Sequence, residues 1–555
     1  MPDTARAGDF DRPAGDPHQS RSVAVAEHGM VATSQPLAVL AGLDVLKRGG
    51  NAADAAVAAN AVLGVVEPMS CGIGGDLFVI YWDAKTQKLY GLNASGRSPF
   101  QLNPQVFAEQ GLRQIPDEGP LSWSVPGCVA GWEDLLARFG SRPLAELLDP
   151  AIGYAQDGFA VTEVIAHDWL SSEASLGRWP DSARTFLPGG HAPVVGERFR
   201  NPNLAASLRT IAAGDRDAFY LGELAQRIVE FSKSNGGFFS LADFAEHANE
   251  WVEPVSTNYR GYDVWELPPN GQGIAALQML NLLEAYDLKS LGRGSAEYLH
   301  LLIEGKKLAF ADRARFYSDP AFGEPPVAEL ISKPYAERRR RLIDLERAAT
   351  EVREGDPKLA RGDTVYLVVV DQDRNCCSFI QSIYYGFGSQ VVPGDVGFAL
   401  QNRGALFALD DRHPNRLQPH KRPFQTIIPA MVTSDGKPWL AFGVMGGDMQ
   451  PQGHVQVLVN LVDFGLNVQA AGDAARVRHA GSATPTGIAG EAGGGTVFVE
   501  SGISNDAVES LRGKGHQVER ARGGFGGYQA IFIDWERGTL HGGSDPRKDG
   551  CALGY

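Results

Sequence analysis

The chain has 555 residues, enough for a large hydrophobic core, and its 51 basic and 66 acidic residues give a net charge of −15 at neutral pH. This acidic balance argues against nucleic acid or an anionic membrane surface as a main partner. The longest apolar stretch, residues 52–66, is shorter than the roughly 20 residues that cross a bilayer, so we expect no membrane span.

The start of the chain, residues 1–28, is polar and rich in Asp, Arg, Ala and Pro. It lacks the apolar segment of a secretory signal, so we expect a disordered tail and no export. The five cysteines form no Cys-x-x-Cys pair and do not reach the density of a secreted disulfide domain, which favours free thiols in a reducing compartment. We therefore expect the protein in the cytoplasm.

The first half of the chain is mostly helical in pattern. A leucine-rich helix ends at the Gly49-Gly50 pair, and an alanine-rich helix begins at Asn51 and ends near Glu67, because Pro68 disfavours helix in the residue before it. Strands are predicted at residues 76–82 and 88–93 and around 252–267, and helical segments at residues 131–158, 201–286, 294–318 and 328–348.

After residue 364 the pattern changes to short β-branched runs. Strands are predicted at residues 365–370, 376–384, 397–400, 427–432 and 439–444, followed by a helix at residues 452–464. The polar turn at residues 371–375 joins the first two strands into a hairpin. A helix-rich half followed by a strand-rich half fits an α+β fold of two packed sheets covered by helices.

The polar segment Arg361-Gly362-Asp363 leads into this hairpin through Thr364, which we interpret as a catalytic nucleophile. A threonine hydroxyl needs a base, and one chemical solution makes it the first residue of a chain, so that its own α-amine takes the proton. That solution requires a cut between Asp363 and Thr364. Residues 350–363 suit a cut because seven of the fourteen are charged and they show no apolar periodicity. An ordinary linker is the alternative.

Short motifs along the whole chain occur in an order that is specific for one family. They are Met30-Val31-Ala32, Gly49-Gly50-Asn51-Ala52-Ala53-Asp54-Ala55, Gly72-Ile73-Gly74-Gly75, Asp363-Thr364, Lys421-Arg422-Pro423, Gly446-Gly447, and Ser544-Asp545-Pro546-Arg547 with the terminal Gly554-Tyr555. In this order they resemble the gamma-glutamyltransferase (glutathione hydrolase) family of N-terminal nucleophile hydrolases, over about residues 29–555.

The resemblance implies a four-layer αββα sandwich and a precursor that cuts itself before Thr364. The products would be a large subunit of residues 29–363 and a small subunit of residues 364–555, which stay interlocked as a heterodimer. Members of this family move an acyl group from an amide to water or an amine. The expected partners are therefore a small-molecule amide and an acceptor, with no cofactor.

Two further positions carry roles that the resemblance implies. Gly446 and Gly447 lie between a predicted strand and a predicted helix, where backbone N–H groups can bind an oxyanion, although a Gly-Gly pair is more often a plain turn. Ser382 falls where the family places a hydroxyl against the nucleophile. A strand serine bonded to the backbone is the alternative for Ser382.

The carboxylate-binding part of the acyl pocket departs from the family pattern. The resemblance implies an arginine and a pair of hydroxyls, but the matching positions hold Ser95, Gln425 and Thr426. Arg97 lies two residues after the arginine position and could still make a bidentate contact with a carboxylate. A surface arginine in a Ser-Gly turn is the alternative for Arg97.

The ammonium-binding part of the pocket departs further. The family uses an acidic or amide side chain and an aspartate there, and the matching positions hold Arg403 and Leu406. The loop at residues 408–420 is also shorter than the lid of family members, so we expect a more open pocket. A guanidinium would repel a substrate ammonium and attract a carboxylate or neutral group at the same place.

No metal site is predicted, because the twelve histidines are scattered and His413, His420 and His454 do not pair with Cys or Glu at ligand spacing, and the glycines of residues 523–527 lack the Gly-Lys-Ser/Thr ending of a phosphate loop. We therefore predict a self-processing, cofactor-free threonine amidohydrolase or acyltransferase acting on a γ-glutamyl or similar amide. Two alternatives stay open: an acylase for a deaminated group, such as a glutaryl-β-lactam or a dicarboxylate half-amide, and an unprocessed binding protein without activity. A higher oligomer also stays open.

Overall fold

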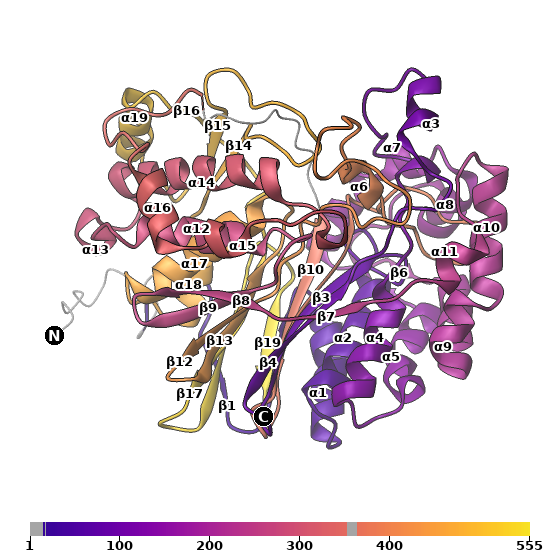
Figure 1. Cartoon of the computed structure of the whole chain (residues 1–555). Helices are drawn as coiled ribbons and strands as arrows, with labels where there is room; N and C mark the ends of the chain where they lie inside the picture. Colours follow the sequence, from indigo (N-terminus) through magenta and orange to yellow (C-terminus); the bar gives the residue numbers. More distant parts are fainter. Residues whose placement is uncertain (1–14, 17, 352–362) are drawn as a thin grey trace.

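The computed structural model describes residues 15–16, 18–351 and 363–555 (Figure 1). Two seven-stranded antiparallel sheets form its centre. The first sheet has the order β1 (Ala24–Ala26), β18 (Thr539–Ser544), β17 (Tyr528–Asp534), β13 (Lys437–Val444), β12 (Ala430–Ser434), β9 (Tyr262–Glu266) and β8 (Val255–Tyr259). The second has the order β19 (Cys551–Gly554), β2 (Met30–Thr33), β10 (Asp363–Val370), β11 (Cys376–Tyr384), β3 (Asp76–Asp83), β4 (Lys88–Ala94) and β7 (Glu250–Val252).

The inner faces of the two sheets share one apolar core. Side chains of β3 and β10, such as Phe78 and Val368, pack there with Met431, Ala441 and Ile531 from the first sheet. Both sheets contain strands from before and after Thr364, so the two parts of the chain are interlocked.

Helices cover the outer face of each sheet, which completes the four layers (Figure 1). Against the second sheet lie α1 (Pro36–Lys47), α2 (Ala52–Val66) and α4 (Cys128–Phe139), and α5 (Leu144–Asp157), α9 (Pro202–Tyr220) and α10 (Glu223–Ser234) pack outside them. Against the first lie α12 (Gly273–Leu283), α14 (Ala296–Phe316), α17 (Met449–Val462) and α18 (Val468–Asp473). The predicted α+β sandwich is confirmed.

The remaining elements are short and peripheral. They are α3 (Pro104–Glu109), α6 (Glu163–Leu170), α7 (Glu173–Leu176), α8 (Pro180–Phe186), α11 (Leu241–Ala245), α13 (Leu288–Leu291), α15 (Val327–Leu330), α16 (Lys333–Arg340), α19 (Asn505–Gly513), the pair β5 (Phe159–Ala160) and β6 (Arg198–Phe199), and a small sheet of β14 (Val477–Ala480), β15 (Thr496–Val499) and β16 (Gln517–Arg520). Over the described residues, no helix has the length and apolar character needed to cross a membrane.

The hairpin of β10 and β11 occupies the middle of the second sheet. Val365 pairs with Gln381 and Val370 with Cys376, and both strands are buried from Thr364 onward. This burial explains the continuous apolar run that predicted the strand, because a central strand has a core on both of its faces. The residues next to the predicted cut are therefore held by a rigid sheet.

Three sequence predictions are wrong in detail. The predicted tail of residues 1–28 is too long, because residues 24–26 form β1 and pair with β18. Residues 397–400 form no strand, because they are buried in an irregular segment in which Gly397 has a φ of +81°. Residues 328–348 form the short helices α15 and α16 rather than one long helix, since Ser332 caps the second helix and Pro334 stands at its first turn.

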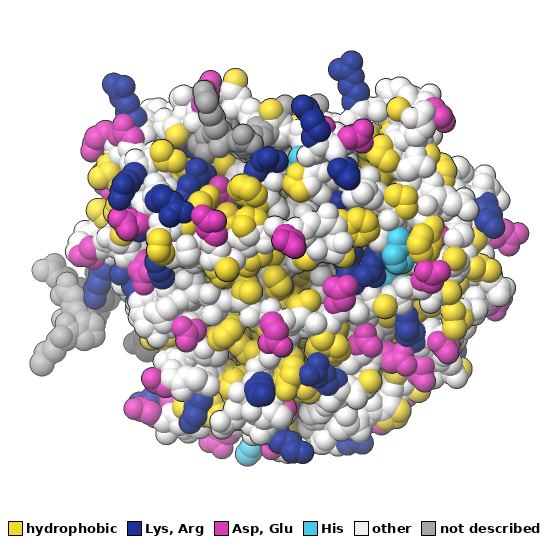
Figure 2. Space-filling model, viewed as in Figure 1, with side chains coloured by type: hydrophobic (Ala, Val, Ile, Leu, Met, Phe, Trp, Pro, Cys, Tyr) yellow, Lys and Arg dark blue, Asp and Glu magenta, His cyan; other side chains and the backbone are white. Residues whose placement is uncertain are grey.

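Charged side chains of both signs are interspersed on the face of the molecule that Figure 2 shows. The acidic excess therefore forms no large patch there.

Candidate functional site

Thr364 is the second residue of β10 and lies at a β-bulge. The register shifts between Asp363, opposite Tyr384, and Val365, opposite Gln381. The Thr364 side chain is buried, and its Oγ1 donates a hydrogen bond to Oγ of Ser382 at 3.3 Å. A bulge re-aims a side chain without breaking the rest of the ladder, so the hydroxyl is presented at the end of a rigid strand.

Ser382, on β11, is also fixed from the other side. Its Oγ accepts a hydrogen bond from the backbone N–H of Tyr384 at 2.8 Å. The structure therefore contains both arrangements that the sequence left open, the contact with Thr364 and the bond to the backbone. This double contact lets Ser382 hold the rotamer of the Thr364 side chain.

Gly446 and Gly447 form the turn between β13 and α17. Their φ angles of +112° and +58° lie in the left-handed region, which favours glycine. Their carbonyls accept hydrogen bonds from the N–H groups of Met449 and Gln450 at the start of α17. Among the described residues, their own N–H groups donate to no acceptor. Two free N–H groups at a strand-to-helix turn are what an oxyanion requires.

A buried side-chain network braces this turn. Nε2 of Gln272 donates to the carbonyls of Gly447 at 3.0 Å and Thr426 at 2.7 Å, and its Oε1 accepts from Arg313 at 2.6 Å. Arg313 also forms a bidentate ion pair with Asp448, at 2.7 Å for each bond. The network joins the glycine turn to the segment that follows the Lys-Arg-Pro motif.

A second polar group surrounds Arg403, which begins the 3₁₀ turn η4 (Arg403–Leu406). The guanidinium is fully buried, and Nη1 donates to Oγ1 of Thr426 at 3.0 Å. The guanidinium carbon lies 5.2 Å from the ring centroid of Tyr384. Burial lowers the pKa of Arg403 to about 10, and the negative charge of Asp76 opposes this shift. Arg403 and Thr426, both predicted pocket residues, are thus in direct contact.

Asp76 is the anion of this group. One of its carboxylate oxygens accepts hydrogen bonds from the N–H groups of Gly96 and Gly127 and from Nε2 of Gln401, and the other accepts from Nε2 of Gln425 at 2.8 Å. Burial raises the pKa of Asp76 to about 6, although Arg403 and the hydrogen bonds lower it. Gln425, predicted in place of a family hydroxyl, therefore serves to orient a buried carboxylate.

Several buried polar atoms of this group lack a partner among the described residues. They are Nε and Nη2 of Arg403 and the Oε1 atoms of Gln401 and Gln425. Buried polar groups in folded proteins are nearly always hydrogen-bonded, because an unmade bond costs the desolvation energy of the group. Two guanidinium nitrogens and two amide oxygens thus keep hydrogen-bonding capacity that the described residues do not use.

The structure does not join Arg97 to this polar group. Its Nη1 donates to the carbonyl of Ala248 at 3.0 Å and its Nη2 contacts Glu250 at 3.2 Å. Glu250 also pairs with Arg422 of the Lys-Arg-Pro motif at 2.7 Å. Ser95, at the family's arginine position, donates to Asn93. The described contacts therefore favour Arg403 over Arg97 as the cation of the acyl pocket.

A cavity of about 380 Å³ opens beside the glycine turn and η4. One wall is apolar and aromatic, and the others carry charged and hydroxyl groups. Its lining includes Tyr384, Tyr385, Leu406, Phe407, Phe424 and the Arg313–Asp448 pair. The cavity meets the site on the side of Tyr384 and Leu406, so it offers space for part of a substrate outside the buried Arg403 group.

Sequence reasoning missed Asp76, Gln272, Arg313 and Gln450 as site residues. Asp76 is predicted only as the first residue of a strand, Arg313 stands inside a helical pattern, and Gln272 and Gln450 lie at the starts of α12 and α17. A carboxylate at the start of a fully buried strand could have indicated a buried polar site, because such a group must be hydrogen-bonded by several donors.

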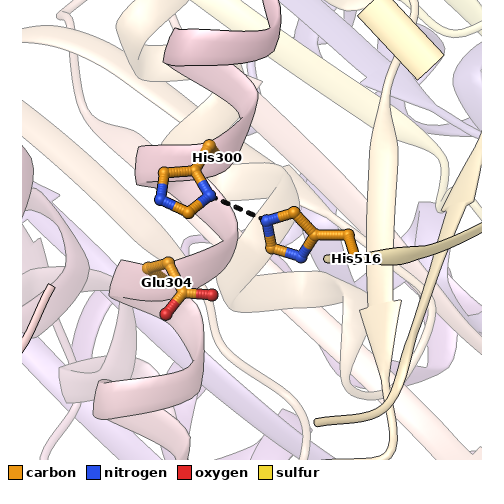
Figure 3. A group of neighbouring side chains, drawn as sticks. All are labelled: His300, Glu304 and His516. Atoms are coloured by element: carbon orange, nitrogen blue, oxygen red, sulfur yellow. Dashed lines mark hydrogen bonds between the residues drawn. The ribbon is translucent and has the colours of Figure 1, made fainter. Parts of the chain in front are cut away.

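Figure 3 shows a separate polar cluster formed by His300 and Glu304 of α14 and by His516. Nδ1 of His300 and Nε2 of His516 are 2.8 Å apart and share a hydrogen bond. Glu304 pairs with Lys307 at 2.8 Å and accepts from the backbone N–H of Ala349. The hydrogen bond between the two histidines and the contacts of Glu304 join α14 to the residues around it, and we interpret the cluster as such a link.

We expect Gly447→Ala to lower turnover by about 10²-fold, the usual effect of losing one oxyanion donor. A methyl group at a φ of +58° strains the backbone and displaces the N–H group. Gly436→Ala is the matched control, because Gly436 has a φ of +74° in an open turn away from the site. Turnover of an acyl anilide by each purified variant is the measurement. Equal turnover of the two variants would place the oxyanion donors elsewhere.

Known proteins resemble this chain over nearly its whole length. The gamma-glutamyltranspeptidase family model matches residues 38–555. The glutathione hydrolase-like YwrD proenzyme of Bacillus subtilis is 40% identical over 533 residues, which cover 95% of this chain and 98% of the relative. The oxamate amidohydrolase proenzyme of Klebsiella pneumoniae is 34% identical over 96% of this chain and 99% of its own length. The crystal structure of cephalosporin acylase from Bacillus halodurans superposes with a TM-score of 0.89 at 42% identity, over 98% of this chain and 99% of that one.

Proposed function

Because the chain belongs to the gamma-glutamyltranspeptidase family of amide hydrolases, we propose that it removes a deaminated dicarboxylic acyl group, such as glutaryl, from an amide. Two relatives named as acylases support this choice. One, from a Pseudomonas strain, is 37% identical to this chain, and the other is the solved Bacillus halodurans structure, at 42% identity. Relatives named as glutathione hydrolases make γ-glutamyl the second candidate.

The proposed chemistry begins with a cut between Asp363 and Thr364, which frees the α-amine of Thr364 and leaves two chains as a heterodimer. The α-amine takes the Oγ1 proton, and Oγ1 attacks the amide carbonyl of the substrate. The N–H groups of Gly446 and Gly447 stabilise the oxyanion, while Ser382 holds the side chain of Thr364. Water then releases the acyl group, or an amine accepts it.

The observation that carries the acyl assignment is the Arg403 guanidinium. It is fully buried, keeps two nitrogens, Nε and Nη2, without a partner in the described structure, and stands beside Thr426. A carboxylate at the end of the acyl chain would accept two charge-assisted hydrogen bonds from a planar guanidinium. The four printed donors to Asp76 are Gly96, Gly127, Gln401 and Gln425, so its hydrogen-bonding positions are taken by groups other than Arg403, although its charge still interacts with the guanidinium.

A γ-glutamyl group is disfavoured by its ammonium. The unpartnered acceptors of the Arg403 group are the uncharged amide oxygens of Gln401 and Gln425, and Leu406 adds an apolar wall, whereas the carboxylates of Asp117, Asp448 and Glu491 line the cavity outside that group. Burying an ammonium without a charged partner costs several kcal/mol, because the lost hydration is not replaced. These two oxygens are nevertheless the observation that keeps γ-glutamyl as the second candidate.

A panel of p-nitroanilides tests the proposal. We expect glutaryl anilide to be cleaved at least as fast, by kcat/KM, as γ-glutamyl anilide, and much faster than butyryl anilide, which lacks the distal carboxylate. A wild-type preference for γ-glutamyl of tenfold or more, about 1.4 kcal/mol, would show that another group binds the ammonium. Equal rates for glutaryl and butyryl would remove Arg403 from acyl recognition.

A further inference from the structure

Gln450 is a buried side chain of α17 that contacts the Thr364 hydroxyl. Its Nε2 lies 3.4 Å from Oγ1 of Thr364, in donor geometry, and its side chain is fully buried. Its backbone N–H donates to the carbonyl of Gly447 at 3.1 Å. Gln450 therefore touches both the hydroxyl that would react and the turn that would bind the oxyanion.

The orientation of the Gln450 amide is fixed by a neighbour. Its Oε1 accepts a hydrogen bond from the backbone N–H of Ile428 at 3.0 Å. Because a backbone N–H can only donate, the oxygen of the amide must face Ile428, and the NH₂ group must then face Thr364. The glutamine is thus a placed donor for Oγ1, held by a residue two positions after Thr426 of the acyl pocket.

We propose that Gln450 is a catalytic residue that stabilises negative charge on Oγ1 of Thr364. The inference rests on the proposed role of Thr364 as nucleophile and adds a donor that acts on the attacking atom, distinct from the donors at the oxyanion. A hydrogen bond strengthens when its acceptor gains charge, so the contact favours the states in which Oγ1 has lost its proton.

The donor acts in both halves of the reaction. In acylation the Oγ1 proton moves to the α-amine, the bond between Oγ1 and the carbonyl carbon forms, and the leaving amine takes that proton as the C–N bond breaks. In deacylation a water proton moves to the α-amine, the water oxygen bonds to the carbonyl carbon, and the bond to Oγ1 breaks as Oγ1 regains the proton. Charge passes through Oγ1 in each half, and Gln450 faces it throughout.

Gln450→Glu tests the proposal with a nearly isosteric change. The glutamate keeps an oxygen for the N–H of Ile428 and replaces the NH₂ group that faces Thr364 by an oxygen. We expect self-processing to slow, and kcat and kcat/KM for the wild-type enzyme's best acyl anilide to fall together by on the order of 10- to 100-fold, with KM unchanged, because the lost bond acts on the transition state.

Gln456→Glu is the matched control. Gln456 lies on the same helix and is also buried, but its amide bonds to the backbone of Val477 and Gln452. We expect this variant to melt at a lower temperature than wild type and to keep kcat within about threefold. If the glutamate variant folds poorly, Gln450→Met is the second test, because it removes the donor without adding an oxygen. We expect the same loss of kcat in Gln450→Met.

Four outcomes distinguish the possibilities. Gln450 variants with kcat within twofold of wild type would overturn the proposal, and so would a Gln456→Glu variant that loses as much kcat as Gln450→Glu. Thr364→Ala is assayed in parallel: if it is processed and active, the nucleophile assignment fails instead. Loss of kcat in both Gln450 variants, with Thr364→Ala inactive and Gln456→Glu active, supports the proposal.

Discussion

Thr364→Ala is expected to remain a single chain of 555 residues and to cleave no acyl anilide above background, whereas the wild-type protein is expected to resolve into chains of 363 and 192 residues. The variant keeps the buried hairpin, because a methyl group fits wherever the threonine side chain does, but it has no hydroxyl for either the cut or the turnover. Mass spectrometry of the denatured protein and an anilide assay are the measurements.

Thr364→Ser is the informative companion, since it keeps the hydroxyl and, after a cut, the α-amine. We expect it to be processed and partly active, because serine lacks the methyl group that restricts the χ1 angle of threonine. A single full-length chain in active wild-type protein would exclude a mechanism that uses the α-amine. A cut at a different residue, seen by mass, would move the nucleophile to that residue.

The elements around the site follow from local sequence. The hairpin of β10 and β11 is predicted to within two residues, because a strand with a core on both faces must be apolar throughout. The start of α2 is equally local: the Asn51 side chain accepts hydrogen bonds from the N–H groups of Ala53 and Asp54, and the Asp54 carboxylate accepts one from the backbone N–H of Asn51. The helix ends at Val66 because Pro68 disfavours helical backbone at Glu67, the residue before it.

The chemistry of the acyl pocket follows from the sequence only in part. Arg403 and Thr426 were singled out because they replace family residues, and the structure brings them together. Asp76 and Gln272 come from other segments of the chain, and no local pattern shows that a buried polar side chain will meet a particular partner far away in sequence. The segment at residues 352–362, where the sequence favours solvated backbone before the cut, lies outside the described residues.

The errors in element boundaries have a related cause. Residues 397–400 are apolar and buried, as the sequence suggested, but the carbonyl of Leu400 accepts from Ser389 instead of from a neighbouring strand. Composition predicts burial there and says little about which backbone partner is used. In residues 328–348 the spacing of apolar residues continues past α16, yet the segment turns to meet α14, where the carbonyl of Asp344 bonds to His300.

Exchanging two residues should reverse the acyl preference. In the variant with Arg403→Gln and Leu406→Asp, we expect the ratio of kcat/KM for glutaryl over γ-glutamyl anilide to fall by on the order of 10³-fold relative to wild type, because removing one partner of a buried charge contact costs about 2–5 kcal/mol. Leu406 lines the 380 Å³ cavity, so an aspartate there can stay hydrated before substrate binds. Steady-state kinetics with both anilides give the ratio.

Arg97→Gln is the control that decides between the two arginines. If Arg403 binds the distal carboxylate, Arg97→Gln keeps the wild-type preference, since its guanidinium contacts Ala248 and Glu250. If Arg403→Gln still cleaves glutaryl anilide and Arg97→Gln does not, then Arg97, in the turn where the family places its arginine, binds the carboxylate instead of Arg403.

The single variants also separate the effects of the two substitutions. Arg403→Gln alone should lower kcat/KM for glutaryl anilide with little change for butyryl anilide, because only the charged acyl chain reaches the guanidinium, whereas Leu406→Asp alone should raise kcat/KM for γ-glutamyl anilide by supplying a charge for its ammonium.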